Sequence, residues 1–220
     1  MVVPRHVGLI PDGNRRWAKK SARGFFTVYG EASENLLRAI RCLFRSGVSY
    51  VSFYGFSLKN FERSDREKGI IFSLIRDKFQ ELKELVEELG VRVHFAGRLE
   101  LFPPDIRKKF SEIESWSRGN RKGTLIALVG YDGNDELDYA VARMKERGGS
   151  LRENMFVPPE VPPVDLLIRT SGEKRLSGFL PYLTGYAELY FSEKLWPDFT
   201  EADLKKALEW YASRERRFGR

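Results

Sequence analysis

The sequence predicts an α/β fold: a single domain with a central, mostly parallel six-stranded sheet flanked by helices. The first observation is that short apolar runs alternate along the chain with longer amphipathic stretches. The second is that several of the short runs are apolar on both faces, as in strands that are covered on both sides. The third is the alternation of strands and helices along most of the chain, which favours a parallel sheet between two covering layers.

The predicted strands are six short segments rich in branched and aromatic residues. They span residues 6–10, 50–56, 92–96, 124–131, 165–168 and 188–191. Between them, apolar residues recur three and four positions apart, which is the spacing of one helix face. These stripes lie within residues 31–46, 67–89, 106–113, 137–144 and 204–211. Ser64 and Thr200 are predicted N-caps, and Gly47, Gly90 and Gly148 are predicted helix ends.

Residues 1–220 are predicted to form one domain. A chain of 220 residues that is 42% hydrophobic can bury one substantial core, whereas two full domains would be a tight fit. Residues 148–163 are rich in proline and are interpreted as an extended connector over the surface. This connector is not a domain boundary, because the part that follows it is too short to fold alone.

The charge balance of the chain is basic. Lysine and arginine outnumber aspartate and glutamate by 38 to 31. Such a surface predicts anionic partners, which are nucleic acid, lipid headgroups or phosphorylated substrates. The balance alone does not choose among these three. Two histidines and one cysteine are too few for a typical zinc site.

Cys42 is the single cysteine, which excludes an intramolecular disulfide and indicates a reducing, cytoplasmic setting. Its apolar neighbours at helical spacing indicate a small, buried side chain. The first residues lack the apolar region of a secretory signal. The longest apolar stretch, residues 125–129, is far shorter than the roughly 20 residues of a membrane-spanning helix. Any membrane contact is therefore expected to be peripheral.

A first candidate site follows the predicted strand 6–10, where residues 11–18 read Pro-Asp-Gly-Asn-Arg-Arg-Trp-Ala. Asp12 supplies hard carboxylate oxygens that suit Mg²⁺, and Gly13 allows the backbone to approach a phosphate closely. Arg15 or Arg16 can bind phosphate oxygens in a bidentate way, and the free amides of a helix start add anion affinity. A simple turn is the alternative, because Asp-Gly-Asn is good turn chemistry.

A second polar loop follows the predicted strand 165–168, where residues 169–177 read Arg-Thr-Ser-Gly-Glu-Lys-Arg-Leu-Ser. Arg169 and Arg175 are six residues apart, so this loop can enclose a diphosphate from two sides. A solvated polar loop is the alternative interpretation. Ligands of open parallel sheets bind beyond the carboxyl ends of the strands, so we expect both loops at that edge.

These segments, taken in order, resemble the cis-prenyltransferase (undecaprenyl diphosphate synthase) family. His6 with residues 11–18 resembles its N-terminal motif, residues 53–63 resemble Y-A-F-S-x-E-N-W-x-R-P, and residues 169–177 resemble R-T-G-G-E-x-R-x-S-N. The resemblance runs from residue 6 to residue 219. It implies an enzyme that condenses an allylic prenyl diphosphate with isopentenyl diphosphate to give a longer (Z)-polyprenyl diphosphate. It also implies an apolar cleft for the prenyl chain, to which the helices 31–46 and 67–89 could contribute, although most of their apolar side chains are expected to be ordinary core.

The resemblance implies a role for each matching residue. Asp12 would bind Mg²⁺ and be essential for catalysis, while Asn60 and Ser57 are candidates for relaying the proton, with a phosphate oxygen as the alternative base. The residues assigned to the allylic diphosphate are Gly13, Asn14, Arg15, Arg16, Arg63 and Phe56. The residues assigned to isopentenyl diphosphate are Arg169, Arg175, Ser177, Arg217 and Gly219.

Two of the matching segments have equally simple structural interpretations. Phe56 could cover the first isoprene unit of the donor and exclude water from a developing allylic cation, or it could be ordinary core. Glu67 matches an acid of the family, but Ser64 and Glu67 also have the spacing of a capping box, which we favour.

The C-terminal part of the resemblance implies an assembly. Glu188 corresponds to an acid linked to the metal site and to the dimer contact, so Asp12 and Glu188 are the predicted metal ligands. Residues 217–219 resemble a tail motif that reaches across a homodimer toward the partner's isopentenyl diphosphate. A paired strand carboxylate and a basic tail are the alternatives. We therefore expect a Mg²⁺-dependent homodimer, without nucleic acid, in the cytoplasm, with peripheral contact at the inner face of the membrane through the product.

The chain departs from the family pattern on the donor side. Thr27 and Glu31 stand where the family usually has an arginine and a histidine that hold the donor diphosphate. A glutamate beside a diphosphate is repulsive unless Mg²⁺ or an arginine intervenes. Either Glu31 points away, or it joins the metal site, or the donor binds differently, and Arg23 is a candidate to compensate.

Other departures lie in the second and third motifs. Lys59, Phe61 and Ser64 replace the usual Glu, Trp and Pro. On the acceptor side, the residues that replace the usual Asn, Leu and Gln are Gly178, Pro181 and Leu183. These changes leave the identity of donor or acceptor open more than the class of reaction.

Three alternatives follow from these observations. A non-catalytic subunit of a cis-prenyltransferase complex would have no use for intact motifs at both residues 12–14 and 169–177. A nucleic-acid-binding module would need a continuous stripe of arginines with exposed aromatic residues, whereas here the arginines cluster in strand-end loops. A prenyltransferase with an atypical donor, acceptor or joining mode is suggested by Glu31 and Gly178.

Overall fold

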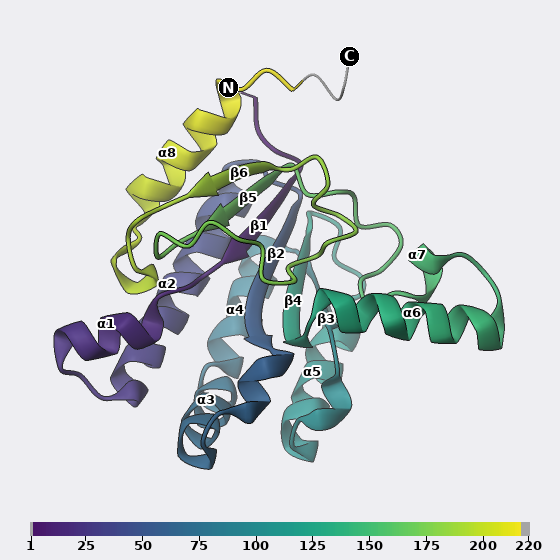
Figure 1. The fold of residues 1–220 in the computed structure, drawn as a ribbon, viewed down its shortest axis with the longest axis horizontal. Coiled ribbons are helices and arrows are strands. Elements are labelled where there is room, and N and C mark those ends of the chain that lie inside the picture. Colours follow the sequence, from purple (N-terminus) through teal and green to yellow (C-terminus); the bar gives the residue numbers. More distant parts are fainter. Residues whose placement is uncertain (1, 217–220) are drawn as a thin grey trace.

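The computed structural model describes residues 2–216, and a twisted parallel sheet forms its centre (Figure 1). Its strands are β1 (His6–Ile10), β2 (Tyr50–Ser57), β3 (Arg92–Ala96), β4 (Thr124–Tyr131), β5 (Leu166–Arg169) and β6 (Glu188–Phe191). They lie in the order β3-β4-β2-β1-β5-β6, and each neighbouring pair in the described chain is parallel. The predicted six-stranded sheet is confirmed, and each predicted strand lies within one residue of its observed bounds.

The helices are α1 (Asn14–Ser21), α2 (Phe25–Arg45), α3 (Asp65–Asp77), α4 (Phe79–Leu89), α5 (Pro104–Ser117), α6 (Gly133–Arg147), α7 (Leu151–Asn154) and α8 (Glu201–Ala212). Short 3₁₀ helices span Leu58–Glu62 (η1), Leu99–Leu101 (η2) and Trp196–Asp198 (η3). The single helix predicted over residues 67–89 is wrong in one respect, because the chain breaks at Lys78 between α3 and α4. No helix among residues 2–216 is both long enough and apolar enough to cross a membrane.

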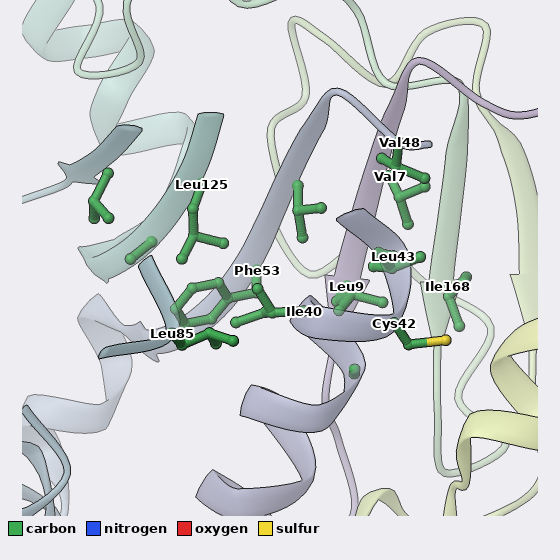
Figure 2. Packing of buried hydrophobic residues seen from close by; sticks show 14 of the residues in the cluster. Val7, Leu9, Ile40, Cys42, Leu43, Val48, Phe53, Leu85, Leu125 and Ile168 are labelled. Carbon is green, nitrogen blue, oxygen red and sulfur yellow. The ribbon is translucent and has the colours of Figure 1, made fainter. Parts of the chain in front are cut away.

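The larger core lies between one face of the sheet and the helices α2, α4, α5 and α8. Figure 2 shows Ile40 and Leu43 of α2 beside Leu9 of β1 and Phe53 of β2. Cys42 is buried on the same helix, as its apolar neighbours predicted. Because β1 and β4 are buried along almost their whole length, their position is fixed from both faces and their carboxyl ends are held rigidly.

The opposite face of the sheet is covered in large part by extended chain rather than by helices. Val157, Val161 and Phe179 pack in a second apolar cluster with Ile126 and Leu167. The connector 148–163, predicted to run over the surface, thus contributes to the core. Phe179 lies so close to β1 that a Cβ atom at Gly8 would stand 2.7 Å from its ring, which explains a glycine in the middle of a buried strand.

His6 joins three segments beneath this second cluster. Its Nε2 atom lies 2.7 Å from Ser52 Oγ, and its Nδ1 atom lies 2.8 Å from the Pro162 carbonyl oxygen. Its backbone N–H donates to Asp165, 3.0 Å away. Burial lowers the pKa of His6 to about 4, with a small further contribution from Arg152, while Pro162 and Asp165 act in the opposite direction. The imidazole is therefore neutral at pH 7.

We expect the fold to lose stability as the pH falls from about 6.5 toward 4. Unfolded histidine binds a proton below about pH 6.5, whereas folded His6 stays neutral down to about pH 4, so protons favour the unfolded chain in this window. Between pH 6.5 and 5 the loss from this group is roughly 2 kcal/mol. Urea titrations at both pH values measure it. A His6→Gln variant with the same pH dependence as the unmodified chain would contradict this assignment.

Candidate active site

A cleft of about 850 Å³ lies between α2, α3 and α4 and the adjoining face of the sheet. Its interior is apolar, and the residues that line it include Leu36, Leu37, Ile40, Ile71, Leu74, Ile75, Phe79, Leu82, Phe95 and Phe110. Both helical segments that could contribute to the cleft do so, and more of their apolar side chains line it than the expectation of mostly ordinary core implied. Lys78, at the break between α3 and α4, also lines the cleft and forms ion pairs with Glu34 and Glu81.

The polar end of the cleft is strongly basic. Among the described residues, six basic side chains at or after strand ends line the cleft, against the carboxylates of Asp12 and Asp132. The basic residues are Arg15, Arg16, Lys59, Arg63, Arg169 and Arg175. They lie at or after the carboxyl ends of β1, β2 and β5, so the site has the charge and position expected for an anionic ligand.

Asp12 and Arg169 meet at this end of the sheet. Ile10 at the end of β1 is the register partner of Arg169 at the end of β5. Arg169 Nη2 donates to Asp12 Oδ2 at 2.8 Å, and its Nη1 donates to Ser177 Oγ at 2.8 Å and to the Arg175 carbonyl. The side chain of Arg169 is only 4% exposed. The prediction that the two motif loops share one edge of the sheet is right.

Thr170 holds the backbone of Asp12 in both directions. Its Oγ1 accepts from the Asp12 N–H at 2.9 Å and donates to the Asp12 carbonyl at 2.7 Å. The Trp196 N–H donates to the same carbonyl at 3.0 Å. These bonds connect the loop after β1 to the loop after β5. They fix the backbone position from which the Asp12 carboxylate extends.

Gly13 and Asn14 complete this turn. Gly13 has φ +108°, and a Cβ atom there would stand 2.8 Å from Leu195, so both the backbone and the packing require glycine. Asn14 Nδ2 donates to the Pro11 carbonyl at 3.3 Å. Its Oδ1 is buried and has no hydrogen-bond partner among the described residues. An oxygen in that condition is available to a ligand.

The residues around Asp12 fit a divalent cation that arrives with a diphosphate. Asp12 Oδ1 accepts from the Gly13 N–H at 2.7 Å, and its side chain is 35% exposed. Within residues 2–216, three or more acids, histidines or cysteines nowhere gather into a metal cage. Magnesium characteristically binds through one or two carboxylates plus substrate phosphates and water. A half-buried carboxylate in the same turn as an unpartnered amide oxygen suits that mode.

Glu188 does not join Asp12 within one chain. It begins β6 opposite Leu166, whereas Asp12 follows the far end of β1. Three residues of strand separate the two levels, which is roughly 10 Å along the sheet before the width of two strands is added. Glu188 instead lies 3.2 Å from Arg214. Within a single chain, Asp12 and Glu188 are therefore too far apart to bind the same metal ion, contrary to the prediction. Two predicted residues of the isopentenyl diphosphate site, Arg217 and Gly219, lie outside the described residues.

The segment after β2 is shaped by a register irregularity between Tyr54 and Ser57. Ser57 and Asn60 both line the cleft, and Asn60 Oδ1 accepts from the Ser57 N–H at 3.0 Å. Phe56 also lines it, although it is 2% exposed and packs edge-on against Phe61 at 4.9 Å. Phe56 is thus core and cleft wall at once.

The capping-box interpretation of Glu67 is half right. Ser64 Oγ accepts from the Glu67 N–H at 3.3 Å, as a cap requires. The Glu67 carboxylate, however, turns toward the site, where it lies 2.7 Å from the Tyr29 hydroxyl and 3.0 Å from Arg63. The acid that the sequence assigned to local structure therefore belongs to the surroundings of the cleft.

Glu173 bridges the two arginine-bearing loops. Its Oε1 lies 3.3 Å from Arg16, and its Oε2 pairs with Arg175. Both arginines are half-exposed or more, so solvent screens these pairs and weakens them. An anionic ligand could therefore replace Glu173 on either arginine at small cost.

One of the two donor-side departures, Glu31, forms a local ion pair, whereas nothing in the structure explains Thr27. Arg23 lies 2.5 Å from Glu31, and neither residue lines the cleft, nor does Thr27. Arg23 therefore compensates the charge of Glu31, which is one of the outcomes that the sequence suggested.

The acceptor-side departures are explained by packing. Gly178 has φ +76° and accepts a hydrogen bond from Gly133 N–H at 3.0 Å, while Pro181 packs against Gly133. Leu183 is buried in the second apolar cluster. Of these three positions, Gly178 alone borders the cleft in the described chain. Their changes therefore seat the loop on the start of α6 and leave the cleft lining largely unaltered.

Sequence reasoning missed Tyr29, Thr170 and Glu173 as residues of the site. Thr170 and Glu173 lie inside the motif 169–177, and each also contacts a residue of the segment after β1, which the motif alone does not show. Tyr29 carries no local signal, because its partners Arg63 and Glu67 are more than 30 residues away. The spacing of Arg63 and Glu67, one helical turn apart, is the signal that could have exposed this pair.

Comparison with known proteins gives the family. A family profile described as "Putative undecaprenyl diphosphate synthase" matches residues 10–219. The chain belongs to this family. It is therefore a prenyltransferase of the cis type.

Individual relatives agree with this assignment over nearly the full length. An isoprenyl transferase of Thermotoga maritima is 36% identical, with 100% of this chain and 98% of the relative aligned. A tritrans,polycis-undecaprenyl-diphosphate synthase (geranylgeranyl-diphosphate specific) of Pyrobaculum aerophilum is 35% identical over 99% of this chain and 97% of the relative. The crystal structure of lavandulyl diphosphate synthase from Lavandula x intermedia, in complex with dimethylallyl diphosphate, is 29% identical and superimposes with a TM-score of 0.92 over 99% of both chains.

A Thr170→Val variant tests whether catalysis by the prenyltransferase depends on the two hydrogen bonds between Thr170 and the Asp12 backbone. Valine has the shape of threonine but can neither donate to nor accept from the Asp12 backbone, so both bonds are lost. We expect turnover to fall about tenfold or more, since misplaced catalytic groups are costly. Steady-state kinetics measure this. Thr170→Ser keeps the hydroxyl and serves as control; equal losses in both variants would show that packing, not hydrogen bonding, matters here.

Proposed function

We propose that this cis-prenyltransferase condenses an allylic prenyl diphosphate with isopentenyl diphosphate to give a longer (Z)-polyprenyl diphosphate. One observation carries the proposal: two basic loops join through Asp12 and Arg169 at the polar end of an apolar cleft. Two diphosphates side by side need such a rim, and a prenyl chain needs such an interior. The match to the undecaprenyl diphosphate synthase family supports the same reaction.

The donor diphosphate is bound by the loop after β1 and by Arg63. Arg15, Arg16 and Arg63 border the cleft beside Asn14 and neutralise the diphosphate as it leaves. Stabilisation of charge that develops in the transition state is usually the largest catalytic contribution. Because these cations are fixed to helices and strand ends, little reorganisation accompanies the departure of the leaving group.

Isopentenyl diphosphate is bound by the loop after β5. Arg175 and Ser177 border the cleft, and Arg169 ties that loop to Asp12, which supports two adjacent diphosphate sites. In the proposed complex the alkene carbon of the acceptor faces the first carbon of the donor. Holding two reactants in this geometry replaces an improbable encounter. Ser57 and Asn60 border the same region and are the proposed relay for the proton whose loss sets the cis double bond, with a phosphate oxygen as the alternative base.

We propose Mg²⁺ as the cofactor, held by Asp12 together with substrate phosphates. When bound, it supplies Lewis-acid stabilisation of the diphosphate oxygens. The cytoplasmic location and peripheral contact at the inner face of the membrane remain predictions of the sequence. The apolar wall formed by α2, α3 and α4 excludes water from the growing chain.

The enzymatic test uses purified protein, Mg²⁺, labelled isopentenyl diphosphate and a panel of allylic diphosphates. We expect butanol-extractable label, its removal by a chelator, and a loss of about 1,000-fold or more in Asp12→Ala, which removes the carboxylate. Asp105→Ala is the matched control, because Asp105 also pairs with an arginine but lies on α5 away from the cleft. Failure to incorporate label with every donor would refute the enzyme and favour a non-catalytic subunit.

A second candidate is the joining of two allylic diphosphates in an irregular mode. The specific support is the superposition on lavandulyl diphosphate synthase bound to dimethylallyl diphosphate. The same assay distinguishes the two, with mass analysis of products formed from dimethylallyl diphosphate alone. A branched product without isopentenyl diphosphate would favour this mode, whereas products that lengthen only when isopentenyl diphosphate is present would exclude it.

We also propose a homodimer through the edge of the sheet at β6. A strand edge with an unpaired row of backbone groups invites pairing, and Leu189 and Tyr186 there are 39% and 70% exposed. Leu189→Glu should yield a monomer by light scattering after gel filtration. Leu101→Glu, at a leucine that is 51% exposed on η2, should leave the dimer intact. A chain that is monomeric before any substitution would contradict the proposal.

A further inference from the structure

Behind the cleft wall lies a buried acid that the proposed reaction does not use directly. Glu67 is 5% exposed and does not line the cleft. Its Oε1 lies 3.0 Å from Arg63 Nη1 and accepts from the Tyr29 hydroxyl at 2.7 Å. The Tyr29 oxygen in turn accepts from Arg63 Nη1 at 2.9 Å. The three side chains form a closed triangle contributed by α2, the end of η1 and α3.

The bond directions in this triangle are fixed by chemistry. Burial, and then the hydrogen bond to Glu67, raise the pKa of Tyr29 to about 12, so the hydroxyl keeps its proton throughout the physiological range. It must therefore donate to the carboxylate, and its lone pair is free to accept from the guanidinium. Burying a carboxylate is costly unless it is paired, and an apolar group could have filled the space. Stability alone therefore does not explain why a charged triangle, rather than apolar side chains, occupies this position.

The triangle orients Arg63 rather than removing it from use. Both side-chain bonds that the structure gives Arg63 use Nη1. Arg63 is 23% exposed and borders the cleft. Arg15 also borders it, with Nε 3.9 Å from the same Glu67 oxygen. The acid thus fixes Nη1 of the Arg63 fork, and the side-chain contacts among the described residues leave Nη2 and Nε available on a residue that borders the cleft.

We infer that Tyr29 and Glu67 are positioning residues that hold the Arg63 guanidinium in place for the donor diphosphate, an inference that rests on the proposed function. Arginine has long, flexible side-chain torsions, and its value at a phosphate depends on the orientation of its planar fork. With Nη1 held from behind by a hydroxyl and a carboxylate, the fork meets the diphosphate already oriented. Tyr29, on α2, thus acts through Arg63 although it carries no charge.

Tyr29→Phe is the cleaner probe of this arrangement. It removes one oxygen atom, changes no charge and leaves the ring against Phe25, with which Tyr29 stacks at 6.0 Å. Glu67→Gln also removes a negative charge near a diphosphate, and that change alone favours binding, so its two effects oppose each other. We expect Tyr29→Phe to raise the KM for the allylic donor about five- to tenfold and to leave the KM for isopentenyl diphosphate within about twofold.

A matched control is available on another helix. Tyr139 on α6 also accepts from an arginine, Arg143 Nη1 at 2.7 Å, but does not line the cleft. Tyr139→Phe makes the same chemical change at a distance from the site, and should leave both KM values unchanged. Thermal melting of the two variants separates a change in folding from a change in donor binding.

A double-mutant cycle decides whether Tyr29 acts through Arg63. In an Arg63→Ala background we expect Tyr29→Phe to have no further effect on the KM for the donor, because the group it positions is gone. If Tyr29→Phe folds poorly, the cycle is run with Glu67→Gln. In the Arg63→Ala background only its charge effect remains, so there we expect the substitution to lower the donor KM. A full effect in the Arg63→Ala background, or a donor KM unchanged in Tyr29→Phe, would overturn the inference. An inactive unmodified enzyme would instead refute the proposed function, so the two failures are distinct.

Discussion

The ion pair between Asp12 and Arg169 is the contact on which the rest of the site depends. Arg169 is almost fully buried, and a buried guanidinium requires compensation from the carboxylate and from the oxygens of its own loop. The pairing follows from the register of β1 and β5, which sets Ile10 opposite Arg169. The distance between the two headgroup loops is therefore a property of the sheet. Thr170 repeats the connection through the backbone, so a rigid scaffold rather than a flexible loop holds the motif residues.

Carboxylates interleaved among the basic side chains explain how this end of the cleft stays ordered before an anion binds. Glu67 and Glu173 each lie between two arginines that would otherwise repel one another, and Asp12 pairs with the buried Arg169. The three differ in burial, and this difference assigns them different tasks. Glu173 pairs with well-exposed arginines through weak, exchangeable contacts, whereas Glu67 is buried and keeps its partners. Exposed pairs can yield to a diphosphate, and buried pairs keep the arginines oriented while they do.

The sheet and the motif loops could be predicted because their signals are local: apolar runs of strand length, and short motifs at strand ends. What could not be predicted depends on partners distant in sequence. Ser64 and Glu67 satisfy a capping pattern, yet the carboxylate is taken by Tyr29 on another helix. Lys78 is a good helix former, and ion pairs with Glu34 and Glu81 accompany the break there. Glu188 stands close to the acceptor motif in sequence, and only the strand register shows that it lies at the other end of β6.

The division of the cleft into a polar rim and an apolar interior also bears on where product length is set. In the proposed reaction each new unit is inserted beside the diphosphates, so the older end of the chain must move deeper, along α2 and α3. The residues at the polar end contact the same chemical groups in every cycle, so their contacts do not change with the length of the prenyl chain. The contacts of the apolar residues farther along the cleft, such as Phe79, Leu82 and Phe110, do change, because these residues lose free space with each added unit. In the proposed reaction, product length is therefore set by cleft residues that take no part in the chemistry. For this reason the motifs that identify the reaction do not predict the length of its product.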